Sequence, residues 1–188
     1  MNSEASGGLQ AAALGVAALL EPGRRVCLVT HVNPDGDGLG SEVALVHLLR
    51  RRGVDALITN PTPTQSRLGF LFDSIPDADG SARAVRELRR ADAIVVVDIA
   101  DLSRLGNLGE TVQERGVPVA CIDHHASPGT LPDGPRLIDA TAAATGELVF
   151  SLAKAAGWPL SVDAARALYV ALVTDTGGFR FSNTRPAT

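Results

Sequence analysis

The chain has 188 residues, of which 45% are hydrophobic, so it is long enough for one domain with a substantial buried core. Its formal net charge is −4, from 17 basic and 21 acidic residues. This balance argues against a protein that grips long duplex nucleic acid through a broad positive surface. Any nucleic-acid partner should therefore be short or small.

The N-terminal stretch from Leu9 to Leu20 is apolar, but no basic region precedes it and Pro22-Gly23 interrupts it. Because it is too short to span a bilayer, we predict a first helix packed on the surface, with no export signal and no membrane partner. Cys27 and Cys121 lie in short apolar runs, where a free thiol acts as a small buried side chain. Free thiols are typical of a reducing cytoplasm, where we expect this protein.

Further along the chain, short β-branched runs alternate with longer helix-like stretches, as in sheets whose parallel strands are joined by crossover helices. We therefore predict an α/β fold with a parallel-stranded sheet and helices on both faces. The expected strands are 25–30, 55–59, 93–98 and 119–123, and the expected helices are 39–52, 81–90, 102–115, 141–156 and 161–174. Gly53 should end its helix and Ser81 should cap the next one. The apolar run 67–72 is too short to assign.

Acidic and imidazole side chains follow three of the predicted strands. In open α/β sheets the ligand crevice lies beyond the carboxyl ends of the strands, so we expect these side chains to meet at one site. The candidates are His31, Asp35 and Asp37 after the first strand, Asp98 after the third, and Asp123, His124 and His125 after the fourth.

Asp98 distinguishes a functional site from ordinary turn chemistry. The loop 33–40 alone could be a set of turns, because Asp-Gly is a common turn dipeptide. Asp98, however, directly follows the run Ile94-Val95-Val96-Val97, which places a charge at the edge of a core strand. Such a charge needs a partner, and a metal ion is one.

The histidines and Asp175 can also be either metal ligands or ordinary structural residues. His124 and His125 leave their strand in different directions, so one imidazole can bind a metal while the other faces a substrate. Asp175 lies at the C-terminal end of a predicted helix, where the dipole disfavours an unneutralised carboxylate, although a solvated helix end also explains it. His47 lacks ligand-like neighbours and is interpreted as a packed or solvated residue.

Ligand chemistry narrows the choice of metal. Carboxylate and imidazole together favour manganese, zinc or iron over calcium or magnesium, and the lack of cysteine in the set weighs against structural zinc. The carboxylates of Asp35, Asp37, Asp98 and Asp175 carry a charge of −4, which two divalent cations would balance.

Four segments, HVNPDGDGLGS, VVVDIADLSRLG, CIDHH and ALVTDTGGF, occur in this order across nearly the whole chain. Together they resemble the DHH phosphoesterase superfamily, and within it the NrnA-type enzymes. The resemblance implies a manganese-dependent hydrolase acting on very short RNA, on adenosine 3′,5′-bisphosphate, or on linear or cyclic di-adenosine nucleotides. Mg²⁺, Co²⁺ and Fe²⁺ are alternatives to Mn²⁺.

The resemblance also implies a role for each candidate residue. One ion would be held by His31, Asp35 and Asp98, and the other by Asp37, Asp98, His124 and Asp175. Asp98 would thus be shared, and a water activated by the two ions would be the nucleophile. Asp98, Asp123 and His125 would be catalytic, Asp123 acting from behind the ligands. His125 and Arg104 would contact the substrate, with His125 stabilising the phosphate or donating a proton.

Members of the superfamily usually continue into a second, DHH-associated domain that carries a glycine-rich, basic substrate-binding motif. We expect residues 1–188 to be the catalytic domain alone, with the linker starting at 182–186 and the second domain absent. Metal binding should then survive better than turnover.

Two alternative functions stay open: an inorganic pyrophosphatase-like hydrolase with the same ligands, and a non-catalytic nucleotide-binding module of the same fold. A nicotinamide-dependent dehydrogenase fails, because Gly36, Gly38 and Gly40 lack the third glycine of the fingerprint spacing and the aspartates of this loop would repel a pyrophosphate. The sequence leaves the preferred nucleotide and homodimer formation undecided.

Overall fold

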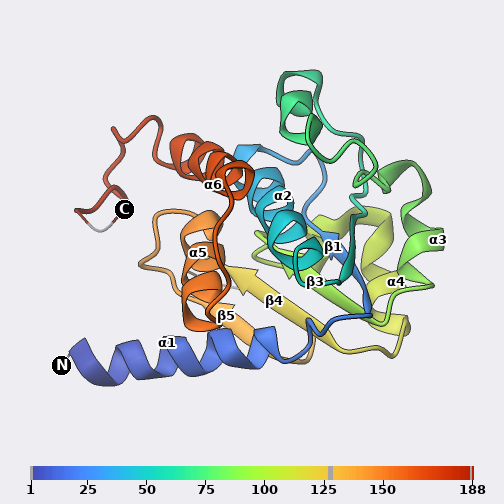
Figure 1. Cartoon of the computed structure of the whole chain (residues 1–188), viewed down its shortest axis with the longest axis horizontal. Coiled ribbons are helices and arrows are strands. Elements are labelled where there is room, and N and C mark those ends of the chain that lie inside the picture. Colours follow the sequence, from blue (N-terminus) through green and yellow to red (C-terminus); the bar gives the residue numbers. More distant parts are fainter. Residues whose placement is uncertain (1, 127–128, 187) are drawn as a thin grey trace.

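A five-stranded, fully parallel sheet forms the centre of the computed structural model, which describes residues 2–126, 129–186 and 188 (Figure 1). The strand order is β2-β1-β3-β4-β5. The strands are β1 (Arg25–Val29), β2 (Asp55–Ile58), β3 (Ala93–Val97), β4 (Val119–Asp123) and β5 (Arg136–Ile138). The chain runs outward from β1 to β2 and then returns to β3 on the other side, so the carboxyl ends of β1 and β3 flank a topological switch point.

Helices cover both faces of this sheet, as predicted. The α-helices are α1 (Asn2–Ala17), α2 (Gly36–Arg50), α3 (Ala84–Leu88), α4 (Gly109–Glu114), α5 (Thr145–Ala155) and α6 (Val162–Asp175), and the 3₁₀-helices are η1 (Ser66–Phe72), η2 (Ser81–Arg83) and η3 (Leu102–Leu108). Residues of α1, α2, α5 and α6 share one apolar core with the sheet, whereas α3, η3 and α4 cover the other core. In Figure 1, α6 lies alongside α2. Among the described residues, no helix is both long and apolar enough to cross a membrane.

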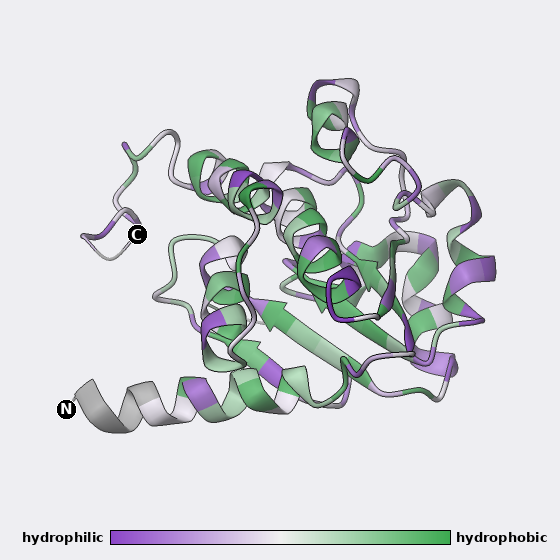
Figure 2. Ribbon diagram, viewed as in Figure 1, coloured by the Kyte–Doolittle hydropathy of each residue, from purple (hydrophilic) through white to green (hydrophobic). Residues whose placement is uncertain are grey.

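The two cores arise from the alternation of side chains along each strand. In β1, Val26 and Leu28 pack into the core under α2, while Cys27 and Val29 point to the core under α3 and η3. Both faces are buried, so the strands are almost continuously hydrophobic, and they are mostly green in Figure 2. Cys27 and Cys121 are buried free thiols, as predicted.

The predicted strands are confirmed to within one residue at their ends, but β5 was missed. It has three residues, pairs only with β4 among the described strands, and reads Arg-Leu-Ile after a proline. Three residues are too few to show an alternating pattern.

The start of α2 corrects the predicted boundary by three residues, from Leu39 to Gly36. Glycines typical of a loop lie here in the first turns of the helix, where they allow close packing. A Cβ on Gly40 would lie 2.6 Å from the backbone carbonyl oxygen of Ala167 in α6. The Asp35 side chain caps the helix by accepting hydrogen bonds from the backbone N–H groups of Asp37 and Gly38.

Other helix boundaries also differ from the prediction. The stretch 81–90 forms η2 and α3, and Ser81 does not cap them, because its hydroxyl accepts a bond from Asn60 N at 3.1 Å. The stretch 102–115 is divided by Gly106, whose φ of 55° breaks the helix. α5 begins at Thr145 instead of 141, and α1 begins and ends earlier than predicted. α6 is confirmed, with Ser161 as its cap and one further residue at its end.

Candidate metal centre

Eight of the nine candidate site residues lie together beyond the carboxyl ends of β1, β3 and β4. We call this group the strand-end cluster; it consists of His31, Asp35, Asp37, Asp98, Asp123, His124, His125 and Asp175. Asp35 and Asp37 come from the N-terminal end of α2, and Asp175 from the C-terminal end of α6. The fold therefore brings these distant segments to one place, at the switch point of the sheet.

One half of the cluster surrounds His31. Its Nε2 lies 3.9 Å from Asp35 Oδ2 and 3.7 Å from Asp98 Oδ2. Its Nδ1 lies 2.8 Å from the carbonyl oxygen of Val32, which can only accept, so Nδ1 carries the proton. Nε2 therefore faces the two carboxylates, the arrangement in which a neutral imidazole can bind a metal through its second nitrogen.

The other half surrounds His124. Its Nε2 lies 3.0 Å from Asp175 Oδ2, 3.6 Å from Asp37 Oδ2 and 3.7 Å from Asp98 Oδ1. Its Nδ1 lies 3.4 Å from the carbonyl oxygen of Ala142. Asp98 thus has one carboxylate oxygen toward each half of the cluster. The separations leave room for a cation between the donor atoms of each half.

Asp98 turns toward both halves because its backbone leaves the strand conformation directly after β3. Its φ is 58°, in the left-handed region, where aspartate is tolerated better than most residues. Ala100, two residues later, also has a positive φ of 55°. A non-glycine residue in this region costs of the order of 1 kcal/mol, and such residues concentrate at functional sites.

Asp123 and His125 form a pair at the rim of the cluster. Asp123 is fully buried, and its Oδ1 accepts a hydrogen bond of 2.6 Å from His125 Nδ1, while its Oδ2 accepts one from Ala100 N at 3.0 Å. The His125 side chain is 34% exposed. The hydrogen bond to Asp123 raises the pKa of His125, although partial burial opposes it. His125 is therefore a half-buried imidazole whose orientation is fixed by a buried carboxylate and whose protonated form that carboxylate favours.

The electrostatics of the cluster show a lack of positive charge. Burial raises the pKa of Asp37 well above its usual value, and the charges of Asp98 and Asp175 raise it further. Burial alone would lower the pKa of His124, but its bond to Asp175 and the nearby carboxylates raise it to about 9. Bound cations would supply the missing positive charge and lower both pKa values, so metal binding would compete with protons here. The oxygen and nitrogen donors also fit a divalent transition metal.

The ninth candidate, Arg104, is not brought into the cluster through its side chain, which is exposed. Its backbone carbonyl instead accepts a hydrogen bond of 2.8 Å from Val32 N, next to His31. Its contact with a substrate stays a prediction, as do the individual ligand roles of the other residues.

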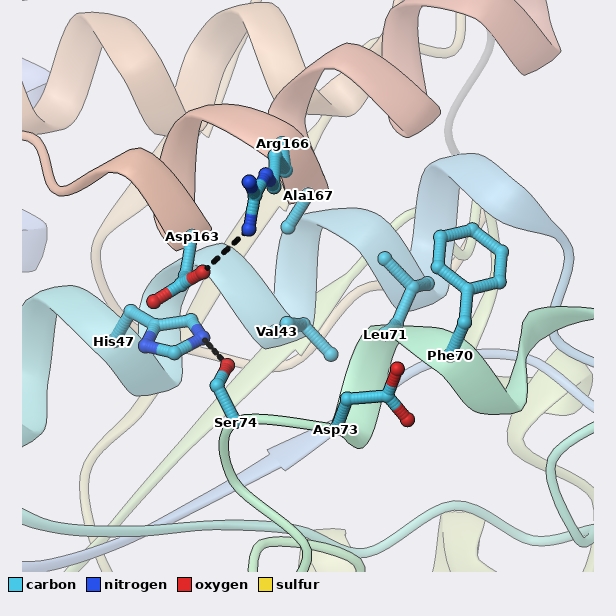
Figure 3. Close-up of a pocket in the computed structure, with 9 residues that line it drawn as sticks. All are labelled: Val43, His47, Phe70, Leu71, Asp73, Ser74, Asp163, Arg166 and Ala167. Atoms are coloured by element: carbon cyan, nitrogen blue, oxygen red, sulfur yellow. Dashed lines mark hydrogen bonds and ion pairs between the residues drawn. The ribbon is translucent and has the colours of Figure 1, made fainter.

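His47 lies outside the cluster. It follows Asp37 by ten residues in α2, so the two are separated by roughly 15 Å along the helix axis. Figure 3 shows it in a separate pocket between α2, η1 and α6, near Asp163, which pairs with Arg166. The distance from His47 Nε2 to Ser74 Oγ is 3.3 Å. The interpretation of His47 as a packed residue agrees with this position.

The first turn of α5 was missed by the sequence analysis. Thr145 N and Gly146 N donate hydrogen bonds to the Asp37 carboxylate, and Thr145 Oγ1 donates one to Asp98. The available signal was a Thr-Gly pair after a run of alanines, which marks a helix start only weakly. With the helix predicted from 141, Thr145 fell in its interior.

Comparison with known proteins identifies the architecture. The sequence profile of the DHH family, N-terminal domain, matches residues 25–172. The chain belongs to the DHH family. It is 32% identical over 167 residues to the bifunctional oligoribonuclease and PAP phosphatase NrnA of Thermus thermophilus, which covers 86% of this chain and 46% of the relative. The chain spans about half the length of the curated NrnA proteins that it matches.

Solved structures of the DHH type share the fold. An exopolyphosphatase-related protein from Bacteroides fragilis superimposes with a TM-score of 0.85 and 26% identity, over 94% of this chain and 53% of that protein. RecJ of Thermus thermophilus, in complex with Mn²⁺, superimposes with a TM-score of 0.56 and 22% identity, over 90% of this chain and 24% of RecJ. The likeness to RecJ concerns the fold alone.

Proposed function

We propose that this DHH domain holds two divalent cations, preferably Mn²⁺, in the strand-end cluster and hydrolyses phosphate esters of short RNA or small adenine nucleotides. The observation that carries the proposal is the position of Asp98, whose two carboxylate oxygens lie 3.7 Å from His31 Nε2 and from His124 Nε2. A carboxylate so placed can be shared by two cations. The relationship to NrnA, an oligoribonuclease and PAP phosphatase, supports the substrate class.

The protein groups divide the ligand role between two sites. His31, Asp35 and Asp98 would hold one cation, and Asp37, Asp98, His124 and Asp175 the other. The bound cations would lower the pKa of the attacking water and neutralise charge on the phosphoryl oxygens. Without them, four carboxylates would repel a phosphate.

His125 would act on the leaving group. Hydrolysis forms a bond from water oxygen to phosphorus and breaks the ester bond, so the departing sugar oxygen needs a proton. In its protonated form the half-buried imidazole of His125, fixed by Asp123, can donate it or stabilise the phosphoryl oxygens. Asp123 would therefore be a positioning group for His125, which is a narrower role than a direct part in catalysis.

A phosphoanhydride substrate is the second candidate. The Bacteroides fragilis structure is described as exopolyphosphatase-related, and the proposed cation sites would suit a bridging phosphoanhydride oxygen as well as an ester oxygen. Pyrophosphate and polyphosphate therefore belong in the same test.

The test is a hydrolysis panel with the 188-residue chain, in Mn²⁺ and after chelation. The substrates are a di-adenosine dinucleotide, adenosine 3′,5′-bisphosphate, pyrophosphate and polyphosphate. We expect Mn²⁺-dependent release from a nucleotide substrate, reduced at least about 100-fold in His125→Ala. His47→Ala, a histidine change outside the cluster, is the control and should keep full activity. Tight Mn²⁺ binding without turnover on any substrate would favour a non-catalytic binding module.

A further inference from the structure

The N-terminus of α5 is capped by a residue from another helix. Its own N-cap, Ala144, offers no side-chain hydrogen bond. Instead, Thr145 N donates to Asp37 Oδ2 at 2.7 Å and Gly146 N donates to Asp37 Oδ1 at 3.0 Å. The first N–H groups of a helix lack partners within the helix, and their dipole favours an anion, so Asp37 and α5 stabilise each other.

Thr145 also bonds a second carboxylate. Its hydroxyl donates to Asp98 Oδ1 at 3.0 Å. Thr145 is fully buried, so both hydrogen bonds are shielded from water. One residue of α5 therefore ties together Asp37 from α2 and Asp98 from the end of β3.

These two bonds involve the carboxylate oxygens that face His124. Asp37 Oδ2 lies 3.6 Å, and Asp98 Oδ1 3.7 Å, from His124 Nε2. Each carboxylate oxygen has two lone-pair directions, and Thr145 occupies one on each oxygen. The remaining lone pair of each oxygen is thereby held toward the space in front of His124.

The position of Thr145 is itself fixed by close packing. A Cβ on the next residue, Gly146, would lie 2.6 Å from the Cβ of Ala171 in α6. The first turn of α5 can approach Asp37 and α6 this closely only because residue 146 has no side chain. The hydroxyl of Thr145 is therefore held between the two carboxylates by the helix packing around it.

We infer that Thr145 is a positioning residue of the metal centre, which orients Asp37 and Asp98 so that both can bind the cation beside His124. The inference rests on the proposed function, since it assumes that this cation is bound. In this role Thr145 acts through its hydrogen bonds to Asp37 and Asp98, which are the proposed ligands.

The experiment measures Mn²⁺ binding by calorimetry and by electron paramagnetic resonance, without any substrate. Thr145→Val keeps the shape and the backbone donors but removes the hydroxyl, and Thr145→Ala removes it without adding a methyl group. We expect both to weaken one of the two Mn²⁺ sites by about 10- to 100-fold and to lose the spin coupling between the ions. Thr145→Ser keeps the hydroxyl and should bind as the wild type does.

Thr59→Val is the matched control. Thr59 is also fully buried and its hydroxyl donates to Leu28 O at 3.0 Å, outside the strand-end cluster. The Thr59→Val variant should lower the melting temperature of the metal-free protein as Thr145→Val does, but it should leave the Mn²⁺ affinity unchanged. A purely structural role for Thr145 would make the two variants alike in both measurements.

The outcomes separate this inference from the proposed function. If the wild type binds two Mn²⁺ ions and Thr145→Val or Thr145→Ala binds them within about twofold as tightly, the inference is wrong and the proposed function stands. Weak binding by Thr145→Ser would also overturn it. If the wild type binds no Mn²⁺, both are wrong.

Discussion

Buried acids occur at both ends of the central sheet, but they are neutralised in different ways. Glu87, near the amino end of β1, has an almost fully buried side chain and bonds three guanidinium groups: Arg25 at 2.7 Å, Arg83 at 3.0 Å and Arg86 at 3.1 Å. The strand-end cluster holds more carboxylates and, among the described residues, no lysine or arginine forms an ion pair with them. The contrast appears in the pKa values. Burial by itself would raise the pKa of Glu87, but its arginine partners outweigh burial, so the pKa is lowered. The pKa of Asp37, in contrast, is raised.

The difference separates an acid that the chain itself neutralises from acids that it leaves without a basic partner. Glu87 finds its positive charge within the chain, so its ion pairs form when the protein folds. The strand-end cluster lacks that charge and can obtain it only from histidine protonation or from bound cations. Substitutions in the strand-end cluster should therefore affect metal binding, whereas a substitution at Glu87 should affect folding stability.

The largest effect is expected from Asp98→Ala. Because Asp98 faces both halves of the cluster, its loss should remove both ions and all measurable hydrolysis. Elemental analysis of the purified variant measures the bound metal, and Glu87→Gln serves as the control that keeps its metal. An Asp98→Ala protein that retains both ions would contradict the shared-ligand role.

Removal of the metal should have the second-largest effect. Cations that bind only the folded state stabilise it by about 2.7 kcal/mol at a free concentration about 100 times Kd. For a chain of this size, a chelator should then lower the melting temperature by about 5–10 °C. Differential scanning calorimetry with and without Mn²⁺ provides the comparison. An unchanged melting curve would argue against a preformed site.

At the other end, Glu87→Gln should lower the free energy of unfolding by about 1–2 kcal/mol at neutral pH, since two of its arginines are largely exposed. The pKa of Glu87 is lower in the folded state than in the unfolded state, so this stabilisation is present above the unfolded pKa and disappears as the pH falls through the folded one. Urea unfolding at pH 7 and pH 3 should show the gap between variant and wild type closing in acid. A gap as wide at pH 3 as at pH 7 would mean that charge is not its cause.

The smallest effect is expected at Glu42, a buried acid that has neither an arginine partner nor a place in the proposed cation sites. Its Oε2 accepts a hydrogen bond of 2.7 Å from Asn60 Nδ2, and no described residue bonds Oε1. Burial raises its pKa well above the usual value, so it opposes folding increasingly as the pH rises from the unfolded pKa. Glu42→Gln keeps the acceptor and should be more stable than the wild type by about 1 kcal/mol at pH 8. Equal stability of the two proteins at pH 8 would contradict a raised pKa of Glu42 in the folded state.

The sequence predicted the parts of the site that follow from local pattern. Asp98 and Asp123 could be placed because each ends an apolar run, and parallel strands bring such ends to one edge. Thr145 could not be placed, because its partners are Asp37 and Asp98, which lie 108 and 47 residues away in sequence. A helix capped by a distant carboxylate has no local capping signal, so its start was predicted four residues too early.

The fold shows the same limit. The strands that fill the core were predicted within one residue, whereas the three-residue edge strand β5 was not recognised. Ser81 has the composition of a helix cap, yet its hydroxyl bonds Asn60 across the fold. Local propensity is enough to predict an element with a long apolar pattern. Whether a short segment forms a strand or a helix depends on its tertiary contacts.

Calorimetric titration of the metal-free chain with Mn²⁺, in two buffers of different ionisation enthalpy, tests the central claim most directly. The account predicts two ions per chain, with protons released as they bind, because the raised pKa values of Asp37 and His124 leave protons for the cations to displace. Absence of binding, or binding of a single ion with no proton release, would contradict it.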